Sequence, residues 1–300
     1  MQEFFIKVLE PLKIVFTLLP IVYLGFILSE VILRKSVIFY LKRYIRSELG
    51  ILFFLHFINP HLGFRVLQLI KPYLKEKEFI KLYLICFYAI VINGYIIYIL
   101  PLSFVLGKAG IYFAFGKFVQ DIFLGLITFF IYKSLKVKIK LPIKYEEKEK
   151  SLLESFKKAT LDFFKLAKTL LLMVLLVSIL INLHFLDFLK PIFKPISKIF
   201  NLPPEISLAF ISATAGLQVG IAIIVSLLNK GMLNYYEAGL GSLVCDYFNK
   251  SFALFRRNIP TLVAYFGSIG VVLAILETIL LLIGNTVGIL FVIFVGKKIF

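Results

Sequence analysis

The stretch EISLAFISATAGLQVGIAIIVSLL, residues 205–228, decides the fold of this 300-residue chain. It is apolar and long enough to cross a lipid bilayer, which takes about 20 residues of helix. Small and polar residues nevertheless interrupt it, namely Ser212, Thr214, Gly216, Gln218 and Gly220. Small residues permit close contact between helix backbones, and polar side chains within a membrane face other helices or water. The stretch is therefore predicted to be an inner helix of a membrane protein.

The composition of the whole chain also indicates a polytopic membrane protein. Hydrophobic residues make up 60% of it, and its mean hydropathy is +0.96. A soluble domain of this size would expose far too much apolar surface. The net charge is +17, but the basic residues lie between the apolar runs, where Lys and Arg set membrane orientation. We therefore expect a multi-pass protein of the cell membrane, with the lipid bilayer as its partner and no nucleic-acid binding.

Several residue types further narrow the class of protein. Lysine greatly outnumbers arginine and tryptophan is absent, a pattern that favours a thermophilic prokaryotic source. Cys86 and Cys245 lie in apolar runs and are predicted to be packed thiols, with a metal or redox role as the alternative. No phosphate-binding glycine loop and no nucleophile-base set occurs in the sequence. We expect no enzymatic activity and no cofactor.

The apolar runs predict an all-α bundle of about eight spans (eight to ten). They lie near residues 12–33, 50–70, 82–100, 102–132, 169–186, 205–228, 235–255 and 260–296. The run 102–132 is too long for one simple span, so we expect a break, a long tilt or a re-entrant turn in it. Glu277 and Gly284-Asn285 interrupt the last run, which predicts one span and a short terminal helix. Residues 36–47 and 186–200 are predicted to be interfacial amphipathic helices.

The two halves of the sequence resemble each other when one is shifted by 155 positions. Lys35 then falls on Lys190, Ile51 on Ile206 and Leu62 on Leu217, and with a small insertion Pro101 corresponds to Pro260. We predict two internal repeats, 1–132 and 169–300, joined by a charged linker, 133–168, on the cytoplasmic side. In membrane proteins such repeats usually form a pseudo-symmetric fold with a site at their interface.

The second half carries a recognisable order of motifs. AGLQVG (215–220) is followed by NKG (229–231), by the acidic Glu237, and by RRNIP (256–260) before a glycine-rich span. This order resembles the nucleoside-recognition, or Gate, domain family. The first half resembles a divergent copy, with INPHLGFRVLQLIKPYLKEKEF (58–79) and ILPLSFVLGKAG (99–110). The resemblance implies kinship with domains of nucleoside and ferrous-iron transporters and with proteins of unassigned activity, and it implies inverted topology of the two copies.

A solute site is predicted where polar residues of the two halves meet. From the second half it takes Gly216, Gln218, Gly220, Asp246 and Asn249, and from the first half Asn59 and Asn93. For Gly216, Gln218 and Gly220 the alternative is that they only permit close crossing of helices. Carboxamides offer both a donor and an acceptor, which suits a nucleoside-like solute. For Asp246 the alternative is packing against the cations near Lys250, Arg256 and Arg257. Asp121 and Glu277 hold roughly equivalent repeat positions and are predicted to bind a coupling ion, with structural pairing to nearby cations as the alternative.

His56 and His61 are candidate metal ligands. His56 and His61 are five apart and point to different faces of an unbroken helix, so a metal site needs a break at Asn59-Pro60. Hydrogen bonding between helices is expected instead.

The expected function is a transporter or permease-like protein for a small polar solute. The alternatives are a non-transporting membrane scaffold or assembly protein, and metal-ion transport. In a transporter, polar residues of both halves should converge at mid-membrane depth, whereas in a scaffold they should be scattered and satisfied locally. The oligomeric state stays open, including a homo-oligomer.

Overall fold

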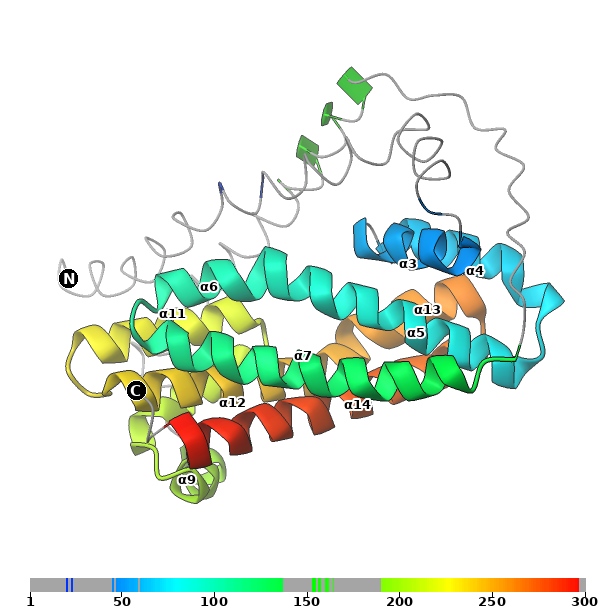
Figure 1. Ribbon diagram of the computed structural model, residues 1–300. Helices are drawn as coiled ribbons and strands as arrows, with labels where there is room; N and C mark the ends of the chain where they lie inside the picture. The colour runs from blue at the N-terminus through cyan, green and yellow to red at the C-terminus, as the bar shows by residue number, and fades with distance from the viewer. Residues whose placement is uncertain are drawn as a thin grey trace.

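The computed structural model describes residues 47–58, 60–136 and 190–296, with isolated residues between 20 and 45 and between 153 and 164. Every regular element in these ranges is helical, as an all-α fold requires. The first part contains α3 (Glu48–Ile58), α4 (Pro60–Ile70), α5 (Glu76–Gly94), α6 (Leu100–Val105) and α7 (Ala109–Lys133). The second contains α9 (Lys190–Ile199), α10 (Ser207–Ala213), α11 (Leu217–Asn229), α12 (Tyr235–Ala253), α13 (Ile259–Phe266) and α14 (Ile269–Phe291) (Figure 1). The runs predicted at 12–33 and 169–186, the helix predicted at 36–47 and most of the linker lie outside the described residues.

Three helices in the described part are long and apolar enough to cross a membrane. They are Glu76–Val105, Ala109–Lys133 and Ile269–Gly296, with 30, 25 and 28 residues. A bilayer requires about 20 residues of helix, so each has length to spare. One side of α7 exposes the apolar side chains Phe118, Ile122 and Leu126 at intervals of four residues. Such an outward apolar stripe fits contact with lipid, and the chain has the character of a helical membrane protein.

The prediction of one inner helix over 205–228 is wrong. The stretch forms two short helices, α10 and α11, separated at residues 214–216, where Gly216 is extended (φ 174°, ψ 143°). The chain folds back there and brings α11 against α10. This is seen at Gly220, where an added Cβ would lie 2.8 Å from Ala213 Cβ and 2.9 Å from the carbonyl oxygen of Ala209. Small residues on both helices permit this approach. With 13 residues, α11 is too short to cross a bilayer alone.

The run at 50–70 is also divided, into α3 and α4. Pro60 begins α4, and a proline cannot donate the backbone hydrogen bond that would continue α3. The chain bends so sharply that a Cβ at Gly63 would overlap the ring of His56. Asn59 lies outside the described residues. We refer to α3–α4 and α10–α11 as the two helix pairs.

The break predicted within 102–132 is confirmed, and the one predicted near Glu277 is misplaced. The first long run is interrupted at Gly107, whose φ of 58° lies in the left-handed region that favours glycine. In the last run the interruption is at Gly267 (φ 67°), and α14 continues unbroken through Glu277 and Asn285. Glycine within α14 serves helix contact instead, since a Cβ at Gly288 would overlap the carbonyl oxygen of Gly116.

The elements of the two parts follow the same order. After each helix pair comes a 19-residue helix, α5 or α12, that continues into a five-residue π-helix, η2 (Tyr95–Ile99) or η5 (Leu254–Asn258). A short helix with proline in second place follows, α6 or α13, then the left-handed glycine and a long helix, α7 or α14. The two long helices run antiparallel, because Gly116 lies against Gly288 while Gln120 lies against Gly284.

The buried apolar residues form two cores, and each core mixes both parts of the chain. The first core joins α3, α4 and α5 to residues of α13 and α14, such as Phe266 and Leu273. The second joins α10, α11 and α12 to residues of α6 and α7, such as Leu102 and Phe113. Figure 1 shows α3 and α4 near α13, and α11 toward the opposite end of the long helices. A hydrogen bond from Lys71 Nζ to the carbonyl oxygen of Phe266, 2.7 Å long, also links the two parts.

Candidate functional site

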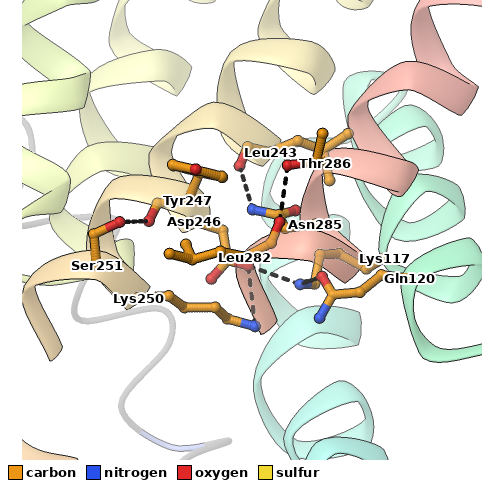
Figure 2. Close-up of polar contacts among 10 residues, drawn as sticks. All are labelled: Lys117, Gln120, Leu243, Asp246, Tyr247, Lys250, Ser251, Leu282, Asn285 and Thr286. Atoms are coloured by element: carbon orange, nitrogen blue, oxygen red, sulfur yellow. Dashed lines mark hydrogen bonds and ion pairs between the residues drawn. The ribbon is translucent and has the colours of Figure 1, made fainter. Parts of the chain in front are cut away.

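A cluster of charged and amide side chains lies where α7, α12 and α14 meet (Figure 2). We define the charged cluster as Lys117, Gln120, Asp121, Asp246, Lys250 and Asn285. Lys117 Nζ lies 2.7 Å from Asp246 Oδ2, and both side chains are only 2% exposed. Lys250 Nζ lies 3.3 Å from the same oxygen. One carboxylate therefore receives two ammonium groups from different helices.

Residue spacing and small residues explain why these side chains meet. Lys117, Gln120 and Asp121 are three and four positions apart on α7, so they share one helix face. Asp246 and Lys250 are four apart on α12 and share a face for the same reason. The helices approach closely, since a Cβ at Gly116 would lie 2.6 Å from a methyl carbon of Leu243 on α12.

Among the residues that the structure describes, two amide atoms in the charged cluster find no hydrogen-bond partner. Gln120 Oε1 accepts a hydrogen bond from Lys117, but Gln120 Nε2 is buried and unsatisfied. Asn285 Nδ2 donates to the carbonyl oxygen of Leu243 at 3.1 Å, but Asn285 Oδ1 is buried and unsatisfied. A buried unsatisfied polar group costs about 1–3 kcal/mol. The cluster thus holds one spare donor and one spare acceptor, and a small polar molecule that reached both would relieve that cost.

Asp121 completes the charge balance of the cluster. Its side chain is 9% exposed, and its negative charge acts on both Lys117 and Lys250. Two lysines therefore face two carboxylates. Among the described residues only Asp246 lies within 4.0 Å of these ammonium groups, whereas Asp121 acts on them from further away. Charges withdrawn from water are tolerated when opposite charges accompany them.

Of the other predicted site residues, some lie next to the charged cluster and some do not. Gly220 lies beside Cys245, the residue that precedes Asp246: a Cβ at Gly220 would lie 3.1 Å from Cys245 Sγ. Asn249 is half-buried, three positions beyond Asp246. Gly216 forms the turn between α10 and α11, and Gln218 is half-buried on the first turn of α11. Within the described ranges the side chain of Gln218 has no hydrogen-bond partner.

Asn93 has a role that sequence reasoning did not foresee. Its Nδ2 donates a hydrogen bond to the carbonyl oxygen of Phe57, in the last turn of α3. Backbone carbonyls at a helix end lack intrahelical donors, so the amide supplies the missing partner. Asn93 therefore holds the first helix pair against α5. Asn59, which was predicted to accompany it, lies outside the described residues.

Within the described part of the chain, His56 does not form the expected hydrogen bond between helices. Its ring is fully buried, and Nδ1 shares a 2.9 Å hydrogen bond with the carbonyl oxygen of Leu52, in the same helix. The side chain of His61 lies outside the described residues. No group of three or more His, Cys, Asp or Glu able to hold a metal occurs among the residues placed here, and Cys86 and Cys245 are free, buried thiols.

Lys117, Gln120 and Asn285 are the site residues that sequence reasoning missed. A signal for Lys117 was present, because an ionisable residue inside an apolar run marks a functional or paired group. Asp121 was recognised on that ground, yet Lys117 lies four positions before it and satisfies the same criterion. For Asn285 the sequence predicts only an interruption of the last run. Its amide instead bonds to the backbone of α12.

Comparison with known proteins identifies relatives without assigned activity. No protein-family model and no solved structure matches the chain. Uncharacterized protein MJ1589 of Methanocaldococcus jannaschii is 22% identical over 231 residues, which cover 75% of this chain and 94% of that protein. From the same organism, uncharacterized proteins MJ0880 and MJ0871 are 27% and 26% identical over 126 and 122 residues. These matches cover 42% and 40% of this chain and only 41% and 38% of the two relatives.

Proposed function

We propose that this protein is a multi-pass protein of the cell membrane that binds and moves a small, polar, nucleoside-like solute. The charged cluster is the observation that carries the proposal. It draws Lys117, Gln120 and Asp121 from the first part of the chain and Asp246, Lys250 and Asn285 from the second. Intramembrane polar groups from two parts of a chain that converge in one place are typical of a substrate or ion site.

The architecture we propose consists of two inverted repeats within a bundle of about eight spans. The common order of helix pair, long helix, π-helix, proline helix, left-handed glycine and long helix supports two repeats. The antiparallel packing of α7 on α14 supports inversion, because corresponding helices of parallel repeats would run in the same direction. Short, broken helices such as α10 and α11 are the elements from which transporters build sites near the bilayer midplane.

The chemistry of the charged cluster favours a solute without net charge. Two lysines face two carboxylates, so a solute ion would disturb an existing balance. The spare donor, Gln120 Nε2, and the spare acceptor, Asn285 Oδ1, suit a molecule that offers both kinds of group on one edge. Nucleobases and nucleosides have such edges. Gln218 supplies a further amide beside the turn of the second helix pair.

A membrane scaffold is the second candidate, and the pairing of Asp246 favours it. Its Oδ2 already receives Lys117 and Lys250, so the ion pair is locally satisfied without any solute. In that case the charged cluster would only fix helix positions. The unsatisfied amide atoms are what a purely structural role leaves unexplained.

The test is a thermal-shift screen of the full-length protein in detergent against nucleosides, nucleobases and divalent metal ions. We expect a neutral nucleoside or nucleobase to raise the unfolding temperature, because ligand binding stabilises the folded state. Gln120→Glu keeps an acceptor for Lys117 and replaces the spare donor by an acceptor. It should weaken binding about tenfold or more, which corresponds to about 1.4 kcal/mol.

The control variant is Asn93→Ala, which removes a bond that holds α3 and leaves the charged cluster intact. It should lower the unfolding temperature and preserve the ligand-induced increase. If no nucleoside or nucleobase stabilises the wild type, or Gln120→Glu binds unchanged, the solute site is not here and the scaffold becomes the stronger candidate. Stabilisation by divalent metals alone would instead support metal-ion transport.

A further inference from the structure

A second buried polar contact lies in the first core, far from Asp246 along the helices. Glu277, in the middle of α14, is 7% exposed, and Tyr83 of α5 is fully buried. The Tyr83 hydroxyl donates a 2.6 Å hydrogen bond to Glu277 Oε2. The Tyr83 ring stacks on Phe64 and Phe87, and Phe266 meets it edge-on. We refer to Glu277 and Tyr83 as the Glu277 site.

No cation neutralises Glu277 at contact distance. In the part of the chain that is described, no Lys, Arg or His nitrogen lies within 4.0 Å of its carboxylate, whereas two reach Asp246. Arg257 of η5 acts on Glu277 from further away, and its own side chain is exposed and bonded to Asn258.

The other titratable groups on the surrounding helices do not replace a cation. On α5 these include Tyr83, Tyr88 and Cys86, which lies fully buried one turn from Tyr83. The nearest lysine of α5, Lys81, is paired with Glu78 at 3.1 Å. On α13 there is Tyr265, whose ring packs against Phe64. The ionisable side chains of α7 and α12 that pack near α14 belong to the charged cluster. Glu277 thus has one neutral donor and no counter-charge in contact.

A buried carboxylate without a counter-charge lowers its free energy by binding a proton. An unpaired buried charge is costly, and such a group generally binds a proton instead of staying charged. Tyr83 occupies Oε2 as an acceptor, and this leaves Oε1 to carry the proton. We propose that Glu277 is a proton-binding site: a proton from water forms an O–H bond at the carboxylate, and the same bond breaks when the proton returns to water. Nothing is oxidised or reduced in this step.

The position of Glu277 connects this site to the charged cluster. Asn285 lies eight residues further along the same unbroken helix, about 12 Å away at 1.5 Å per residue. A shift of α14 on gain or loss of the proton would therefore move an amide of the charged cluster. If the proposed solute function holds, on which this extension alone rests, the proton at Glu277 is the coupling ion. Asp121 is the weaker candidate, because the charges of Lys117 and Lys250 already act on it.

Infrared spectroscopy of the reconstituted full-length protein tests the proton site without any solute. The carbonyl stretch of a protonated carboxylic acid is separate from the bands of carboxylates and amides. We expect a protonated-acid band in the wild type that disappears as the pH is raised and that shifts in heavy water. Glu277→Gln should abolish it. Tyr83→Phe should displace it, because the acid loses its hydrogen-bond donor.

Tyr95→Phe is the matched control, since the Tyr95 hydroxyl bonds to a backbone carbonyl, that of Ala114, and should leave the band unchanged. Absence of the band in the wild type at every pH, or its persistence in Glu277→Gln, would overturn the proposal. If Glu277→Gln does not fold, displacement in Tyr83→Phe decides in favour and an unmoved band decides against. The ligand screen is independent: a band that behaves as expected with no ligand found sustains the proton site and removes the solute function.

Discussion

Lys117 and Glu277 occupy the same position, the ninth, in α7 and in α14, and they carry opposite charges. Because these two helices run antiparallel with Gln120 against Gly284, the two residues lie on opposite sides of the crossing. Lys117 meets a carboxylate on α12, and Glu277 meets a phenol on α5. An ion pair thus fixes α7 on one side of the crossing, while on the other side Glu277 has no cation within 4.0 Å among the described residues.

The pair Lys117–Asp246 should be strongly coupled in stability. Removal of one partner from a buried ion pair costs about 3–5 kcal/mol, and the lower end applies here because Lys250 remains beside Asp246. We therefore expect Lys117→Met to lower the free energy of unfolding by about 3 kcal/mol. The double variant Lys117→Met/Asp246→Leu should lose less free energy of unfolding than Lys117→Met alone, because it leaves no unpaired carboxylate at position 246. Denaturant titration of the reconstituted protein measures both, with Lys230→Met, at an exposed position, as the neutral control. Additive losses would show that the two side chains act separately.

Close approach of α7 and α14 predicts different responses at two glycines. A Cβ at Gly288 would overlap the carbonyl oxygen of Gly116, whereas a Cβ at Gly94 would have no heavy atom within 4 Å. Gly288→Ala should therefore destabilise the fold by about 1–3 kcal/mol through overpacking. Gly94→Ala, in helical geometry, should leave stability unchanged or raise it by up to about 1 kcal/mol. Equal unfolding temperatures for the two variants would contradict the observed helix contact.

Backbone geometry separates Gly267 from Gly216. Gly267 has φ 67° and ψ −144°, a region that is almost restricted to glycine, so Gly267→Ala should cost about 1–3 kcal/mol. Gly216 is extended, and the nearest atoms to an added Cβ lie 3.6 and 3.8 Å away. Gly216→Ala should change the unfolding temperature little. A large loss at Gly216 would mean that the turn between α10 and α11 requires glycine for a reason other than conformation.

Inverted repeats predict the membrane sides of the two breaks. Lys108 and Ser268 are exposed beside Gly107 and Gly267. In a protein with Cys86 and Cys245 replaced by alanine, cysteines at these two positions should react with impermeant reagents from opposite sides. Lys75→Cys should react from the same side as Ser268→Cys, because Lys71, near Lys75, donates a hydrogen bond to the carbonyl oxygen of Phe266, near Ser268. Tyr235→Cys should react from the same side as Lys108→Cys, because Lys108 Nζ lies 5.8 Å from the Tyr235 ring centre. Labelling of both breaks from one side would rule out inversion.

The helical membrane class could be predicted from the sequence, and the shape of the polar runs could not. Hydropathy measures the total apolar content of 205–228, and this content is the same for one long helix and for two short helices packed together. The return of the chain depends on contact between Gly220 and Ala209, which are brought together only by the turn at Gly216. The break at Gly107 was foreseeable because its run exceeded the length of one span.

In the charged cluster, too, some features could be predicted from the sequence and others could not. Asp246 and Asp121 were identifiable, since carboxylates within apolar runs are conspicuous. Lys117 meets the same criterion, but it lies 129 positions from Asp246, and local spacing carries no information about the contact between the two. Asn93 shows the reverse case: an amide in an apolar run looked available for a solute, yet the backbone of α3 occupies it.

The bond between Lys71 and the Phe266 carbonyl has a consequence for biosynthesis. The two residues are 195 positions apart, so the ribosome makes α4 long before its partner exists. The first core, which includes Leu262 and Phe266, likewise stays open until α13 has been inserted. Domains usually close in the order in which they are translated. In this protein the helices made last complete the core begun first, so a stop late in translation should leave the N-terminal half exposed to membrane proteases.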